Sequence, residues 1–243
     1  MLLLLLLLNR YPKKGPGRGR ISKGPTDALV GRTLEFVFAE LARWRDDPDR
    51  QTEKVEERLN AQLCKYLDVA ARDRFPMVYF HHEEKQTGTR RVDMSALPIS
   101  AGIIGQIYHS IYAPFLVLEG KRLPAPPPIS REREYVSGGT EKSGGIQRFK
   151  LSLHGANQKT AAIVGYIQSG SLQSWHSKIN QWIRDLASDT TAVEEKWFVD
   201  EQLAEFAADH ALHIASAWSR HRRSGAAVSA EIRIRHLWVV MQN

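Results

Sequence analysis

The sequence of 243 residues is short of cysteine, and it has no apolar run that could cross a membrane. Cys64 is the only cysteine, which excludes an intramolecular disulfide and a cysteine-rich zinc site. The apolar run Leu2–Leu8 is much shorter than the roughly 20 residues that span a bilayer. The cations follow this run, whereas those of a secretory signal precede it. We therefore expect no membrane association and a reducing, cytoplasmic location.

The sequence also lacks the short motifs of several enzyme classes. Neither GxxxxGK[ST] nor GxGxxG occurs, so the glycines of Val136–Gly145 do not indicate a nucleotide site. We interpret this stretch as a mobile loop near a substrate. The GxSxG elbow of serine hydrolases is absent as well. The charged residues are therefore the main guide to function.

Basic residues are in excess, with 34 Lys and Arg against 27 Asp and Glu and a net charge of +7. Such a balance favours a polyanionic partner. Residues 1–30 concentrate Gly, Pro and cations, so we expect a disordered basic leader. Residues 31–243 are long enough to bury a core as one domain.

Apolar residues recur at helical spacing in some segments and at strand spacing in others. We expect helices at 33–41, 55–67, 146–153 and 172–186, and strands at 77–80, 91–97, 115–123 and 161–167. The C-terminal part predicts an extra helix at 202–211, followed by a hairpin of strands 213–219 and 231–241. The insert 99–112 is expected to form a short helix over the site. This order predicts an α/β fold with a mixed central β-sheet flanked by helices.

The strand-like run Phe115–Leu123 contains an unusual charged stretch, Glu119-Gly120-Lys121. Side chains two apart on a strand point to the same face, so Glu119 and Lys121 should emerge side by side. The preceding strand carries Asp93. Pairing of the two strands would bring both carboxylates to one point beside the lysine, and two carboxylates form an oxygen site suited to Mg²⁺.

An Asp on one strand followed by Glu-X-Lys on the next resembles the PD-(D/E)XK nuclease superfamily, over roughly residues 55–183. The resemblance implies a restriction-endonuclease-like core, here with an extra C-terminal helix and β-hairpin. It implies that Asp93, Glu119 and the carbonyl of Gly120 bind Mg²⁺, for which Mn²⁺ could substitute. It also implies that Lys121 assists the attacking water.

Further residues are assigned through the same resemblance. The upstream acid of the family is matched by Glu56, with Glu57 as the close alternative. Arg148 and Lys150 begin the helix after the glycine-rich loop, where the family often places polar groups that face phosphate. We expect these two residues and Arg122 to contact nucleic acid.

The resemblance implies a metal-dependent nuclease that hydrolyses phosphodiester bonds, with double-stranded DNA favoured as substrate and endonuclease favoured over exonuclease action. A role in prokaryotic restriction or anti-phage defence is associated with such domains, as a homodimer or in a larger complex. Two alternatives stay open. The chain could be a non-catalytic nucleic-acid-binding module, or an interaction subunit that keeps the nuclease fold. For Asp93, Glu119 and Lys121 the alternative to a metal site is a surface ion-pair cluster at strand ends.

Overall fold

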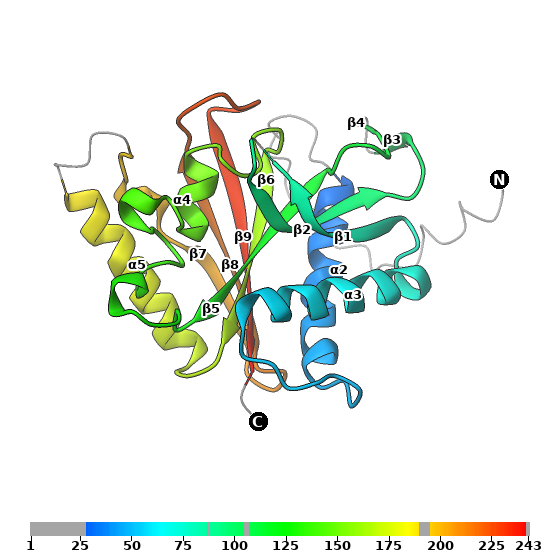
Figure 1. Cartoon of the computed structure of the whole chain (residues 1–243), viewed down its shortest axis with the longest axis horizontal. Coiled ribbons are helices and arrows are strands. Elements are labelled where there is room, and N and C mark those ends of the chain that lie inside the picture. The colour runs from blue at the N-terminus through cyan, green and yellow to red at the C-terminus, as the bar shows by residue number, and fades with distance from the viewer. Residues whose placement is uncertain (1–27, 87, 105–106, 190–194, 242–243) are drawn as a thin grey trace, which may run out of the picture.

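The computed structural model describes residues 28–86, 88–104, 107–189 and 195–241, and its centre is a mixed β-sheet of seven strands (Figure 1). In spatial order the strands are β1 (Val78–Lys85), β2 (Arg91–Pro98), β5 (Leu116–Leu123), β6 (Thr160–Ile167), β9 (Glu231–Val240), β8 (Ile214–Arg222) and β7 (Ala204–Asp209). The three central strands β5, β6 and β9 run parallel, and the other neighbours are antiparallel. In this part of the chain no helix has the length and apolar character needed to cross a bilayer.

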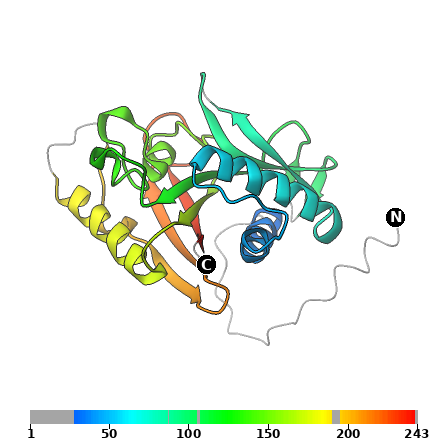
Figure 2. The same cartoon turned by 60° about the horizontal axis from the view of Figure 1, so that its bottom comes forward.

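Helices cover both faces of the sheet, which confirms the expected α/β class (Figures 1 and 2). One face carries α2 (Ala28–Arg45) and α3 (Glu56–Arg74), and the other carries α4 (Gly145–Lys150) and α5 (Leu172–Ser188).

The central strand β5 contributes to the apolar clusters on both faces. Leu116 and Leu118 pack with α2 and α3, whereas Val117 packs with α4 and α5. Because successive side chains alternate between faces, Glu119 falls on the α4 side and Gly120 on the α3 side. Side chains of α4 can therefore reach Glu119, whereas side chains of α3 pack against Gly120.

The segment 202–211, which we expected to be a helix, instead contains the edge strand β7. Its alanines favour a helix by intrinsic propensity. Pairing with β8, from Ala204↔Trp218 to Asp209↔Ile214, nevertheless places it in the sheet. The helix prediction is wrong because backbone pairing with the next strand, in an antiparallel hairpin, outweighs the helix preference of these residues.

The insert 99–112, which we expected to be a short helix, instead contains a small hairpin. Its strands are β3 (Gly102–Ile104) and β4 (Ile107–His109), and they pair with each other in a separate two-stranded sheet. Ile103 and Tyr108 face each other across the hairpin. This prediction is also wrong, because β-branched and aromatic residues favour a strand pair over a helix.

Helix α2 begins before the domain boundary that we expected at residue 31. Leu29 is fully buried and Val30 almost so, and both belong to the cluster beneath α2 and α3. The folded domain therefore includes residues 28–30. The rest of the expected leader, residues 1–27, lies outside the described residues.

A chain that begins at residue 31 should be less stable than one that begins at residue 28. Burial of a Leu or Val side chain contributes about 1.5 to 3 kcal/mol each, so we expect the unfolding free energy to fall by about 3 to 6 kcal/mol. Urea denaturation of the two truncated chains measures the difference. Equal midpoints would show that Leu29 and Val30 add nothing to the core.

A chain of buried polar groups crosses the core on the α4 side. The hydroxyl of Tyr135 lies 2.8 Å from Nδ1 of His236, whose Nε2 lies 2.7 Å from Oγ of Ser219. The same Oγ lies 2.7 Å from Nε2 of His221. Nδ1 of His221 lies 3.6 Å from a carboxylate oxygen of Glu201. Burial lowers the pKa of both histidines, and it lowers that of His236 well below the usual value for a histidine. Both are therefore neutral in the folded protein at neutral pH.

Stability should fall in acid because of these histidines. Their unfolded pKa is about 6.5, so below this pH the unfolded state binds more protons than the folded state and is favoured. Replacement of His236 by Gln removes one titrating group and keeps a hydrogen-bonding side chain. Between about pH 7 and pH 5, wild type should lose about 1 to 2 kcal/mol more unfolding free energy than His236→Gln. Parallel pH profiles for the two proteins would contradict this expectation.

Candidate functional site

Strands β2 and β5 separate in the middle of the sheet, at the residues that the sequence marks. They pair over three positions, of which the last is Met94↔Leu118. The next pair in register would be Asp93 and Glu119. Instead, the Asp93 carboxylate accepts the backbone N–H of Gly120, with 2.7 Å between Oδ2 and N. We call this point of separation the fork.

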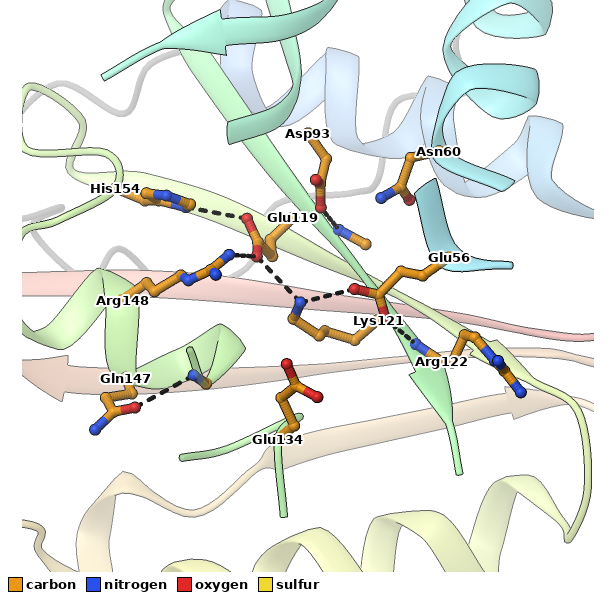
Figure 3. A network of polar contacts seen from close by, with 12 residues as sticks. Glu56, Asn60, Asp93, Glu119, Lys121, Arg122, Glu134, Gln147, Arg148 and His154 are labelled. Carbon is orange, nitrogen blue, oxygen red and sulfur yellow. Dashed lines mark hydrogen bonds and ion pairs between the residues drawn. The ribbon is translucent and has the colours of Figure 1, made fainter. Parts of the chain in front are cut away.

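The carboxylate of Glu119 is fully buried at the fork and is surrounded by three cationic or imidazole groups (Figure 3). Its Oε1 lies 2.6 Å from Nη1 of Arg148 and 3.3 Å from Nζ of Lys121. Its Oε2 lies 3.0 Å from Nδ1 of His154. Burial alone would raise the pKa of Glu119, but the contacts with Lys121, His154 and Arg148 lower it well below the usual range. Glu119 is therefore ionised.

Lys121 is held between two carboxylates. Its Nζ lies 2.9 Å from Oε1 of Glu56, the first residue of α3, and the other oxygen of Glu56 accepts the backbone N–H of Arg122 at 2.9 Å. Burial would lower the pKa of Lys121, but the charges of Glu119 and Glu56 raise it, so the ammonium stays charged. The upstream acid that meets Lys121 is thus Glu56, and Glu57 has no contact in this network.

Asp93 stands next to Glu119 in an environment that opposes its ionisation. Burial and the charge of Glu119 raise the pKa of Asp93 to about 8, although Lys121 and the N–H of Gly120 act in the opposite direction. A buried carboxyl group whose pKa is raised by a neighbouring carboxylate lacks compensating positive charge at its own position. A bound cation would supply it.

The donors at the fork suit Mg²⁺. Asp93 and Glu119 provide carboxylate oxygens, and Gly120 provides a backbone carbonyl beside them. In proteins Mg²⁺ is commonly held by one or two carboxylates and completes its coordination with water and substrate phosphate. Among the described residues no three His, Cys, Asp or Glu side chains are grouped closely enough to hold a metal on their own. A metal at the fork would therefore need ligands from outside the described side chains, and the fork does not fit an all-protein cage.

The residue between Glu119 and Lys121 has to be glycine for a packing reason. A Cβ on Gly120 would overlap the carboxamide of Asn60, one turn after Glu56 on α3. Asn60 is buried, and its Oδ1 accepts the hydroxyl of Tyr166 at 2.8 Å. The carboxamide therefore cannot move aside without breaking a buried hydrogen bond.

The three expected nucleic-acid contacts lie in different surroundings. Arg148 is partly exposed and pairs with Glu119 at the fork. Arg122 is partly buried, and its guanidinium donates to Gln168 at 3.0 Å. Lys150 is 3% exposed, and its Nζ lies 2.7 Å from Oε2 of Glu201 in the core. A lysine in this position cannot contact a phosphate, so we correct the assignment of Lys150 to a structural ion pair.

The glycine-rich loop is tied down by one side chain of α4. Oε1 of Gln147 accepts the N–H groups of Gly138 and Gly144, at 2.9 and 3.2 Å, and its Nε2 donates to the carbonyl of Gly139 at 2.8 Å. We expected a mobile loop, whereas these bonds hold it against α4. A cavity of about 750 Å³ opens beside the loop, and its wall includes Glu134, which Figure 3 places near Lys121.

Sequence reasoning placed Glu56, Asp93, Glu119 and Lys121 at one site, and the structure brings them together. It missed Asn60 and His154. Asn60 has a signal in the sequence, because it is a polar residue on the same helix face as Glu56. His154 lies in the loop after α4 and has no such signal. In comparisons with known proteins, no family model, curated protein or solved structure matches the chain.

Gly120→Ala should destabilise the protein by about 2 kcal/mol or more, since overpacking a core costs roughly 1 to 3 kcal/mol and a buried hydrogen bond is strained as well. Asn60→Ala removes the obstacle and also leaves the Tyr166 hydroxyl without its acceptor. The double variant should therefore lose less stability than the sum of the single variants. Urea denaturation of all four proteins measures the coupling. If the stability losses of the two single variants simply add up in the double variant, Asn60 is not what excludes a side chain at position 120.

Proposed function

We propose that this chain is a metal-dependent nuclease with a restriction-endonuclease-like core of the PD-(D/E)XK type. The observation that carries the proposal is the fork, where Asp93 of β2 meets Glu119 and Lys121 of β5. An ion-pair cluster at a strand end would not require two neighbouring strands to part, nor a carboxylate to replace a backbone acceptor. The excess of basic residues is consistent with a polyanionic substrate.

Asp93, Glu119 and the carbonyl of Gly120 would hold Mg²⁺, or Mn²⁺ in its place. The metal supplies a bound water of lowered pKa and positive charge against the developing charge on phosphate. The protein's part is to keep two carboxylates and one carbonyl at a single point. The hydrogen bond from Gly120 to Asp93 fixes the first carboxylate, and His154 fixes the second.

Lys121 would orient the attacking water and stabilise negative charge on the phosphate oxygens. Its ammonium lies at the edge of the carboxylate pair, and the ion pair with Glu56 keeps it pointed there. A preorganised charge of this kind needs no reorganisation when the reaction occurs, which is the main source of electrostatic catalysis. Glu56 is thus a positioning residue.

We propose double-stranded DNA as substrate and endonucleolytic cleavage as the reaction, with Arg148 and Arg122 as phosphate contacts. Such contacts do not read sequence, so binding should weaken steeply with salt. A cytoplasmic role in restriction or anti-phage defence, alone, as a homodimer or within a larger complex, belongs to the same proposal. One observation favours the alternative of a non-catalytic binding module: Glu119 has no exposed surface and is covered by its partners.

Cleavage of plasmid DNA with Mg²⁺ and with EDTA separates these functions. Asp93→Asn and Glu119→Gln should lose both cleavage and Mn²⁺ binding, because each replaces an anionic carboxylate ligand with a neutral amide. Lys121→Met should keep metal binding and lose about 10² to 10³ in rate, the usual effect of removing one electrostatic group. Lys65→Met, at an exposed position of α3, is the matched control and should cleave normally. Wild-type cleavage by Glu119→Gln would refute the nuclease proposal.

A further inference from the structure

Both oxygens of the Glu119 carboxylate already have partners within the protein. Lys121 and Arg148 meet Oε1, and His154 meets Oε2. A carboxylate enclosed in this way is neutralised by its surroundings. A divalent cation must therefore compete with these three partners for the oxygens of Glu119, and it binds more tightly if one of them withdraws.

The three partners differ in their freedom to withdraw. The side chain of His154 is 1% exposed, and that of Lys121 is 6% exposed and is also held by Glu56. The side chain of Arg148 is 27% exposed, so of the three partners it has by far the most access to solvent. Arg148 is thus the partner that can leave Glu119 without disturbing the core.

We propose that Arg148 is an internal counterion of Glu119 that moves to a phosphate of the bound nucleic acid and so releases the carboxylate for metal binding. This inference rests on the proposed function and adds a regulatory step to the same site. A guanidinium binds a phosphate as readily as a carboxylate, with a similar pair of hydrogen bonds. A phosphodiester at the fork would therefore offer Arg148 a replacement partner.

The exchange makes metal binding and nucleic-acid binding cooperative. If a duplex draws Arg148 away from Glu119, it tightens metal binding, and by linkage the metal tightens duplex binding by the same factor. Without nucleic acid the guanidinium competes with the metal and keeps the affinity low. The chain would then assemble its metal site mainly on its substrate.

The test measures metal binding directly and does not depend on cleavage. Mn²⁺ affinity is read from the electron paramagnetic resonance signal of the free ion, with and without a short phosphorothioate duplex that resists hydrolysis. For wild type the duplex should tighten Mn²⁺ binding about tenfold, a coupling within the usual allosteric range. Arg148→Met should bind Mn²⁺ about tenfold more tightly than wild type without duplex, and the duplex should add little.

Arg122→Met is the matched control. It also removes one guanidinium near the site, but the guanidinium of Arg122 contacts Gln168 instead of Glu119. If loss of any nearby positive charge explained the effect, both variants would gain the same Mn²⁺ affinity, and the inference would be overturned. Circular dichroism and thermal melting confirm that each variant is folded, and Arg148→Lys should stay closer to wild type because it keeps the charge.

Failure of this inference can be told from failure of the proposed function. If wild type binds Mn²⁺ and cleaves DNA, but Arg148→Met behaves like Arg122→Met, only the counterion role is refuted. If neither wild type nor Arg148→Met binds Mn²⁺ with or without duplex, the metal site itself is refuted and the counterion role falls with it.

Discussion

The hydrogen bond between the Asp93 carboxylate and the N–H of Gly120 is the interaction on which the site depends. Two paired strands cannot part inside a protein unless the exposed backbone groups find other partners, since a buried N–H without an acceptor is costly. Asp93 supplies that acceptor. The Asp93 side chain therefore has two roles. It lets the strands separate, and the same hydrogen bond holds its carboxylate at the fork.

A helix of six residues, α4, carries three of the groups that organise this side of the sheet. Arg148 reaches the fork, Gln147 binds the glycine-rich loop, and Lys150 enters the core to meet Glu201. So short a helix has little stability of its own. Its position is fixed by contacts with three segments that lie far apart in the sequence. A change in the core near Glu201 would therefore shift α4 and with it the position of Arg148.

The periodicity of the sequence predicted those parts of the site that depend on which face of a strand or helix a side chain occupies. Strand periodicity placed Glu119 and Lys121 on one face, and helix periodicity placed Glu56 toward the sheet. The sequence could not show that Lys150 turns inward, because only the fold brings Glu201 to it. The strand β7 was missed for a different reason: it pairs with the next strand, β8, across a short turn, and this pairing outweighs the helix preference of its alanines. The nuclease core itself stays a prediction.

The hairpin β3–β4 lies in the connection between β2 and β5, the two strands that carry the site. This connection joins the ends of β2 and β5 that are paired, and the fork is at the opposite end of that pairing. The ladder from Ala96↔Leu116 to Met94↔Leu118 lies between the insert and the carboxylates. Loop closure costs little more as a loop lengthens. This hairpin can therefore be enlarged, shortened or replaced, even by a whole folded module, while the spacing of the Asp93 and Glu119 carboxylates stays unchanged.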